Sequence, residues 1–255
     1  MALKTRTPLH LPSPEPDFSL GWKEVVVNMP DGGRELVQIP LTPEEALHPE
    51  EGYVMPENTE HSRLIENMNE MLKARYANVP SVAVFADLVI EWENPQLKTH
   101  CPDVMVIPNV QARDKKRGQF VVAQEGTRPM LVIEIVSKTS KQADRVTKVD
   151  QYARAGVQEY VYIDSWQRKG QDVWEIAGFR LTGDRYLPML PDEEGSIYCE
   201  TVGLRIGLKD GEVWMQDYGT GEFLMTNLEA QARLAEEKAA REALEARLAE
   251  LEGRK

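Results

Sequence analysis

The middle of the chain alternates short hydrophobic segments with polar turns. Segments rich in Val, Ile, Phe and Tyr recur between residues 81 and 164, and a helical stretch over residues 141–155 separates the last two. They read SVAVFADLVIEW, VMVIP, QFVVA, MLVIEIVS and EYVYID. Before them, apolar residues recur at helical spacing over residues 60–76, where Asn58 and Thr59 are candidate N-caps. The pattern predicts a mixed α/β core with this helix lying on the sheet.

The segments on either side of this core have different patterns. Residues 1 to about 20 contain four prolines, which is typical of an extended arm. Two apolar runs within residues 23–39 flank a Pro-Asp-Gly-Gly turn and predict a β-hairpin. After Asp164, short strands with Gly-Asp and Asp-Gly turns predict a β extension of the same sheet. We expect an arm and hairpin over residues 1–45, a core domain with its extension over 46–225, and a C-terminal helix over 226–255.

The C-terminal segment has the spacing of a coiled coil. From Leu228 onward the chain consists almost entirely of Ala, Glu, Arg, Lys and Leu. Positions spaced alternately by four and three residues form what we call the seam: Ala230, Leu234, Glu237, Arg241, Leu244, Leu248 and Leu251. The alternative is an amphipathic helix that packs on its own domain. In either case this helix is an assembly element, and a coiled coil would join a second copy or another protein.

Composition narrows the class of protein. The 255 residues carry a formal charge of −12, and 42% of them are hydrophobic, which is typical of a globular chain with a buried core. Apolar stretches stay far below the roughly 18–20 residues of a membrane span, and the proline-containing start does not resemble a signal peptide. We therefore expect a cytoplasmic protein. Cys101 and Cys199 are too few for a disulfide framework or a cysteine zinc site, so both are expected to be reduced.

Two acidic residues stand where apolar strands are predicted. Glu134 lies inside MLVIEIVS, whose residues are apolar on both faces, so the buried carboxylate needs a compensating partner. Asp103 follows Pro102 at the start of the strand segment VMVIP. Two carboxylates at neighbouring strand ends are suited to share a metal ion, and oxygen ligands favour Mg²⁺ or Mn²⁺ over zinc.

The ordered motifs resemble a known family. Pro102-Asp103 is followed 31 residues later by Glu134-Ile135-Val136-Ser137, and then by GVQEYVYID at residues 156–164. This arrangement resembles the Uma-type putative restriction endonuclease family of the PD-(D/E)XK nuclease superfamily over residues 61–164. The resemblance implies an α/β fold: a restriction-endonuclease-like mixed β-sheet core flanked by helices. To this core the sequence pattern adds the β extension and the C-terminal coiled-coil helix.

The same resemblance implies roles for the acidic residues. Asp103 and Glu134 would ligate one Mg²⁺ or Mn²⁺ ion, and the backbone carbonyl of Ile135 would add a ligand. The structural alternatives are a turn acid at Asp103 and a buried ion pair between Glu134 and a lysine.

The chain departs from the superfamily pattern at one position. The lysine expected two residues after the acid is replaced by Val136. Lys148 is our candidate for the missing amine, because it lies on the following helix and the superfamily includes lysines displaced in this way. Its alternative is a surface pair with Asp144, four residues earlier. Lys138 and Lys141 lie just past the strand and are better candidates for phosphate contacts.

Two further residues belong to the resemblance. His61 lies on the apolar stripe of the first helix, where a histidine is usually a core residue, but the family places a site residue on this helix. Ser137 corresponds to the serine after the strand and has no nucleophile role, because no base is placed near it in the sequence.

The charge distribution favours a phosphate-binding region near these residues. Residues 111–154 carry a net charge of +5, whereas the rest of the chain carries −17. A basic loop between the two acidic strands is either a phosphate contact or a solvated surface. Its basic residues are Arg113, Lys115, Lys116 and Arg117. We expect a metal-dependent endonuclease that hydrolyses DNA; the alternative is an inactive nuclease-fold module for DNA binding or protein assembly.

Overall fold

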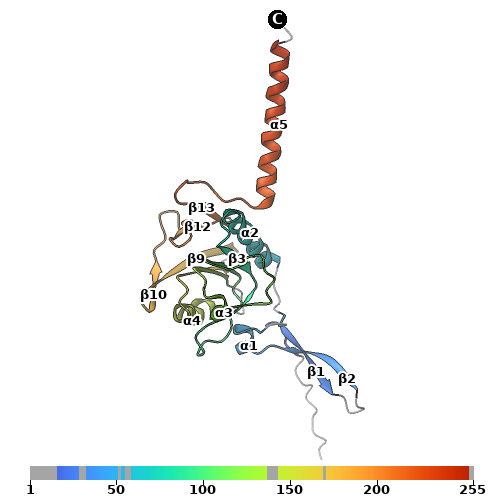
Figure 1. The fold of residues 1–255 in the computed structure, drawn as a ribbon, viewed down its shortest axis with the longest axis vertical. Helices are drawn as coiled ribbons and strands as arrows, with labels where there is room; N and C mark the ends of the chain where they lie inside the picture. Colours follow the sequence, from blue (N-terminus) through green and yellow to red (C-terminus); the bar gives the residue numbers. More distant parts are fainter. Residues whose placement is uncertain are drawn as a thin grey trace, which may run out of the picture. The chain divides into compact units, whose positions relative to one another are not determined.

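The computed structural model describes residues 16–28, 33–50, 53–54, 59–136, 143–168 and 171–252 (Figure 1). The chain forms two compact units, one of residues 1–46 and 52–56 and the other of residues 47–51 and 57–255. In the first unit, strands β1 (Trp22–Asn28) and β2 (Arg34–Pro40) pair antiparallel, as the hairpin pattern predicts. A short helix, α1, spans Pro43–Leu47.

The second unit is built on a six-stranded mixed sheet with the order β10-β9-β8-β7-β5-β3. Only β7 and β8 are parallel neighbours, and the other pairs are antiparallel. Its strands are β3 (Ala83–Ala86), β5 (Val104–Ile107), β7 (Leu131–Ile135), β8 (Glu159–Arg168), β9 (Gln171–Thr182) and β10 (Arg185–Met189). The mixed α/β core is therefore confirmed, and β7 is an interior strand of the sheet with every residue buried.

Alternating residues of β7 divide the core into two layers. Leu131, Ile133 and Ile135 pack with apolar residues of helix α2 (Thr59–Arg75). Val132 packs on the opposite face with residues of helix α4 (Lys148–Arg154), which follows a π-helix over Ala143–Thr147. The second face also receives β4 (Val89–Glu91), β6 (Gln119–Val121) and the short helix α3 (Val122–Glu125). The strand that carries Glu134 is thus covered on both sides.

The segment SVAVFADLVIEW does not form one strand. It divides at Asp87 into β3 and β4, and β4 leaves the main sheet to pair in parallel with β6. Asp87 has φ 50°, a left-handed conformation that aspartate tolerates better than most residues. The apolar composition of the segment hides this break, because both halves are buried.

The predicted β extension is only partly correct. β9 and β10 do extend the main sheet, but β11 (Ile197–Cys199), β12 (Leu204–Lys209) and β13 (Glu212–Asp217) form a separate three-stranded sheet. This second sheet buries Leu204, Ile206 and Met215 in the same layer as α2. The separate sheet forms because its apolar face lies over the α2 layer instead of continuing the edge of the main sheet.

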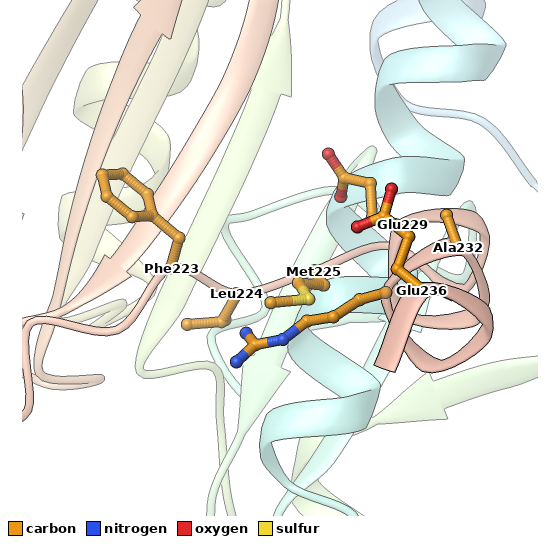
Figure 2. Close-up of a pocket in the computed structure, with 7 residues that line it drawn as sticks. Phe223, Leu224, Met225, Glu229, Ala232 and Glu236 are labelled. Atoms are coloured by element: carbon orange, nitrogen blue, oxygen red, sulfur yellow. The ribbon is translucent and has the colours of Figure 1, made fainter. Parts of the chain in front are cut away.

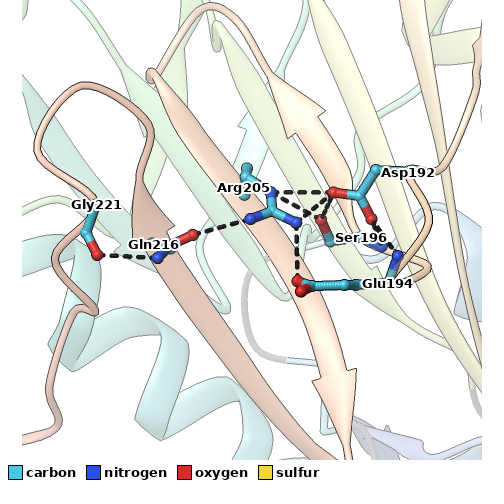
Figure 3. A network of polar contacts seen from close by, with 6 residues as sticks. All are labelled: Asp192, Glu194, Ser196, Arg205, Gln216 and Gly221. Carbon is cyan, nitrogen blue, oxygen red and sulfur yellow. Dashed lines mark hydrogen bonds and ion pairs between the residues drawn. The ribbon is translucent and has the colours of Figure 1, made fainter.

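Arg205 anchors the second sheet to the turn before it (Figure 3). Its guanidinium pairs with the carboxylates of Asp192 and Glu194 and donates to Oε1 of Gln216. Asp192 also accepts a hydrogen bond from the hydroxyl of Ser196, and these donors hold the pKa of its carboxyl well below the usual range. The network holds the turn at residues 192–196 in place beside β12.

Helix α5 (Asn227–Glu252) is a single continuous helix with no buried residue. Its first turn is capped by Thr226 and Glu229, which exchange hydrogen bonds in the manner of a capping box. Within the described part of the chain, no helix is long and apolar enough to cross a membrane. Both cysteines are free thiols, Cys199 buried and Cys101 partly buried.

Candidate active site

The two acidic residues predicted from the sequence lie at the same edge of neighbouring strands. Asp103 directly precedes β5, and Glu134 is the penultimate residue of β7. The strands pair antiparallel with Val104 opposite Ile133, so the start of β5 meets the end of β7. Oδ2 of Asp103 accepts a hydrogen bond of 2.6 Å from the backbone N–H of Ile135. This contact fixes Asp103 beside the strand that carries Glu134.

Glu134 receives two donors from helix α4. The hydroxyl of Tyr152 donates to Oε1 at 2.6 Å, and Nζ of Lys148 lies 3.0 Å from the same oxygen. The Glu134 side chain is 3% exposed and that of Lys148 is 12% exposed, so the ion pair is shielded from water. The structure therefore brings together the acid on the strand and the lysine that we selected on the following helix.

Helix spacing explains how α4 delivers both donors. Lys148 and Tyr152 are four residues apart and so lie on one face of the helix. The Tyr152 ring is buried against Trp92 and His100, with ring centroids 5.9 and 5.0 Å away. Val136, at the expected lysine position, is buried in this same layer. An amine from α4 therefore approaches Glu134 on the face where a strand lysine would lie.

His61 approaches Asp103 from helix α2. Its Nε2 lies 3.4 Å from Oδ1 of Asp103, and both side chains are 13% exposed. The apolar stripe of α2, on which His61 was placed, packs in the core beneath it. Asp103 is thus held between a histidine of α2 and the end of β7.

Comparison with known families decides the assignment. Residues 35–209 match the family described as Uma2, putative restriction endonuclease. The chain belongs to this family. A crystal structure of a putative nuclease belonging to DUF820, from Anabaena variabilis ATCC 29413, resembles it at 16% sequence identity and a TM-score of 0.39. That similarity covers 72% of this chain and 83% of the other. A comparison with curated proteins gives no match.

Membership of the Uma2 family confirms the resemblance and the predicted restriction-endonuclease-like fold, and it makes the protein a member of a nuclease family. The matched region contains Asp103, Glu134 and Lys148, and it also contains His61. It ends at the last residue of β12, so β13 and α5 lie beyond the match.

One acidic residue near the candidate site was not predicted from the sequence. Asp87 follows β3, and its backbone N–H donates to the carbonyl of Pro102 at 3.2 Å. The pKa of the Cys101 thiol is raised to about 12, first by burial and then by the charge of Asp87, to which Glu134 and Asp103 add. The charges of all three carboxylates therefore act on one thiol. Asp87 could have been found from the sequence, because it is an acid inside an otherwise apolar segment.

A second group that the sequence reasoning missed supports the Tyr152 side of the site. Burial, with the nearby charges of Lys148 and His48, lowers the pKa of His100 to about 3, so its ring is neutral. Trp92 Nε1–H donates to His100 Nδ1 at 2.8 Å, so the ring proton is on Nε2 and is donated to Gln151 Oε1 at 2.7 Å. Since Gln151 directly precedes Tyr152, this chain of hydrogen bonds ties α4 to the segments that carry Trp92 and His100.

The basic loop separates into two kinds of side chain. Arg117 binds both oxygens of Glu125 and several loop carbonyls, and its side chain is only 3% exposed. Arg113 donates to the carbonyls of Tyr76 and Ala77 after the end of α2. Both arginines therefore hold the loop together, whereas Lys115 and Lys116 are exposed. The other sequence-based candidates, Ser137, Lys138 and Lys141, lie outside the described residues.

The oxygen groups at the strand ends are of the kind that a hard divalent cation prefers. Among the residues that the structure describes, no three His, Cys, Asp or Glu side chains are grouped so as to hold a metal ion. Asp103 is nevertheless bound to the backbone of Ile135, the residue that follows Glu134. Because a strand residue directs its N–H and C=O to the same neighbour, the Ile135 carbonyl faces the side on which its N–H binds Asp103. Two carboxylates and a carbonyl are ligands typical of Mg²⁺.

Proposed function

We propose that this member of the Uma2 family is a metal-dependent endonuclease that hydrolyses phosphodiester bonds in DNA. The observation that carries the proposal is the ion pair of 3.0 Å between Lys148 and Glu134. Through this pair Lys148 supplies the amine that the chain lacks at Val136, where the superfamily pattern has a lysine. Asp103 lies at the same strand edge.

In this proposal Asp103, Glu134 and the Ile135 carbonyl hold Mg²⁺ or Mn²⁺. The ion, when bound, polarises the scissile phosphate and lowers the pKa of water. Lys148 orients the attacking water and offsets the negative charge that develops on the phosphate. Tyr152 fixes the Glu134 carboxylate through its hydrogen bond of 2.6 Å.

His61 has a different part in the proposed site. Its ring lies beside Oδ1 of Asp103, on the side of that carboxylate away from the Ile135 N–H contact. It orients Asp103, and in the protonated state it contributes positive charge near the phosphate.

Four lysines are proposed as substrate contacts. Lys115 and Lys116 are exposed ammonium groups on the basic loop, suited to contact the phosphate backbone without reading sequence. Lys138 and Lys141 remain proposals of the same kind. The acidic charge of the whole chain predicts weak binding, because its net negative charge opposes the approach of phosphates. The lysine contacts that do form should weaken as the salt concentration rises, because each of them releases counterions.

The test is cleavage of supercoiled plasmid with Mg²⁺ or Mn²⁺ by the wild-type chain, Asp103→Asn and Glu134→Gln. We expect each variant to lose activity by about 10³-fold or more, because the cation loses a charged ligand. Asp114→Asn is the matched control, since it removes the same charge from an exposed acid of the basic loop.

Two results would overturn the proposal. Full activity in Glu134→Gln would exclude this site. Absence of cleavage by the wild-type chain with either metal would favour the inactive module, in which Glu134 and Lys148 form a structural ion pair. A parallel assay on single-stranded RNA decides whether DNA is the preferred substrate.

A further inference from the structure

Helix α5 exposes a row of leucines that its own unit does not cover. Leu234, Leu244, Leu248 and Leu251 are 67%, 62%, 52% and 53% exposed. All four lie on the seam, at the spacing by which two helices interlock in a coiled coil. Burying such side chains is the main favourable term in helix association, so this face is suited to a partner.

The contact of α5 with its own unit uses a different face. A pocket at the base of the helix is lined by Phe223, Leu224 and Met225 of the preceding segment (Figure 2). The helix contributes Glu229, Ala232, Arg233 and Glu236 to it. No seam position is among these lining residues. Asn227 is also tied to α2 through Glu70, which accepts from both its backbone and its side chain. The helix is thus held at its base while the seam stays accessible.

The two charged residues of the seam distinguish between possible pairings with a second copy. In a parallel pair in register, Glu237 would face Glu237 of the partner subunit, and Arg241 would face Arg241 of the partner subunit. Like charges directly opposed across a helix interface are unfavourable. A parallel pair would therefore contain two repulsive layers between its leucines.

An antiparallel pair centred on residue 239 has the opposite property. Glu237 then faces Arg241 of the partner subunit, and two-fold symmetry repeats the pair. In the same register Leu234 faces Leu244 of the partner subunit, and Ala230 faces Leu248 of the partner subunit. The helix spans Asn227–Glu252, so this one register also overlaps almost its whole length. The two seam charges, these apolar layers and the helix length all agree with this register.

We propose that α5 joins two copies of this chain as an antiparallel coiled coil, with Glu237 paired to Arg241 of the partner subunit. The inference rests on the C-terminal helix alone and is independent of the proposed nuclease activity. The matched family region ends before α5, so the assembly element is an addition to the nuclease core.

The test measures the dimer dissociation constant of the full chain by sedimentation equilibrium for Glu237→Arg, Arg241→Glu and the double exchange. Each single reversal places like charges in both central layers, and we expect about tenfold or greater weakening. The double exchange restores opposite charges, so its dissociation constant returns close to that of the wild type. A parallel pair predicts that none of these variants differs strongly from the wild type.

The same set of variants separates the loss of ion pairs within one helix from the loss of pairs between two helices. Glu237 pairs with Arg233 at 3.1 Å, and Arg241 pairs with Glu245 at 2.9 Å, four residues apart in each case. If lost intrahelical pairs caused the weakening, the double exchange would be the weakest dimer. Glu242→Arg is the matched control, because it breaks the corresponding pair with Lys238 at a position off the seam.

A covalent test fixes the direction of the helices. In the variant Ala230→Cys/Leu248→Cys, oxidation should join Cys at 230 to Cys at 248 of the other copy, identified by peptide mass. Bonds between like positions would overturn the antiparallel arrangement. A wild-type chain that stays monomeric at about 100 µM would overturn the proposal altogether.

Discussion

Two buried glutamates on adjacent parallel strands differ in how their charge is compensated. Glu159 begins β8 and is fully buried, while Glu134 lies near the end of β7 and is 2% exposed. In the β7–β8 register, Glu159 faces Leu131, and Glu134 faces Tyr162. Leu131 packs in the layer of α2 and Tyr162 in the layer of α4, so the two glutamates lie on opposite faces of the sheet. Burial alone therefore does not distinguish the two acids.

Glu159 is compensated by two backbone groups as well as by side chains. Its oxygens accept from the backbone N–H groups of Glu200 and Thr201, from the Thr201 hydroxyl and from Nε of Arg180. The donors of Glu200 and Thr201 connect β8 to the turn after β11, and β11 is a strand of the second sheet. An acid bound in this way fixes the two sheets together, and any exchange of its ligands would break backbone contacts.

Glu134 is compensated by side-chain ends from one helix. A phenol and an ammonium meet at Oε1, and both belong to α4. An ammonium on a long, flexible side chain adjusts its position more readily than a backbone N–H. The proposed function rests on this difference: the partners of Glu134 are adjustable, and a second carboxylate lies at the same strand edge.

The largest effect that tests this comparison concerns Lys148. Lys148→Met should lower the cleavage rate by about 10²-fold or more, because the developing charge on the phosphate loses its cation. The double variant Val136→Lys/Lys148→Met places the amine back on the strand, on the same face as Glu134, and should recover part of the activity. Plasmid cleavage under identical metal conditions is the measurement.

Thermal unfolding of these variants separates folding from chemistry. Lys148→Met leaves a buried carboxylate with one donor fewer, so a lower Tm is expected in the single variant. The double variant is also expected to have a lower Tm, because it places a charged side chain at the buried position of Val136. If Lys148→Met keeps the wild-type cleavage rate, the ion pair is structural and the difference between the two glutamates loses its functional meaning.

The next effect concerns Glu159 and is one of stability. Glu159→Ala leaves the N–H groups of Glu200 and Thr201 without their acceptor and should lower the free energy of unfolding by about 3 kcal/mol. The folded fraction should retain its cleavage rate, because the site at Glu134 lies on the other face. Urea unfolding measures the first quantity; a specific activity that falls to the level of Glu134→Gln would contradict the separation.

The smallest predicted effect depends on pH and concerns the support of α4. His100 is neutral in the folded chain with a pKa of about 3, whereas an unfolded histidine has a pKa near 6.5. The unfolded state therefore binds more protons below pH 6.5, and stability falls as the pH drops from there toward 3. We expect a loss of roughly 2 kcal/mol between pH 6.5 and pH 5.

His100→Asn isolates this contribution. The variant is expected to be less stable than the wild type at pH 7, because it loses packing against Tyr152, but to lack this part of the pH slope. Chemical denaturation at both pH values is the measurement. Parallel pH dependence in the two proteins would show that His100 does not carry the effect.

The sequence predicted the buried strand with Glu134 and the helix face with Lys148, because both depend on local patterns. An apolar segment with one acid predicts a buried strand with a partnered carboxylate, and helical spacing places Lys148 and Tyr152 on one face. The structure adds the distance between Lys148 and Glu134, which depends on how α4 packs on the sheet.

Other features were beyond the sequence because they depend on contacts distant along the chain. The turn at Asp87 is hidden in an apolar segment, and its proximity to Cys101 arises only when β3 and β5 pair. The structural use of Arg117 depends on Glu125, which the pattern did not connect to the loop. The second sheet was read as an extension because strand patterns do not specify which sheet a strand joins.

The most direct test of the central claim is a calorimetric titration with Mg²⁺ and Mn²⁺ of three folded proteins: the wild type, Glu134→Gln and Glu159→Gln. Circular dichroism should show that all three proteins are folded under the conditions of the titration. The account predicts metal binding by the wild type and Glu159→Gln, and its loss in Glu134→Gln. Equal binding by Glu134→Gln and the wild type, or no binding by the wild type, would contradict the assignment of the metal site.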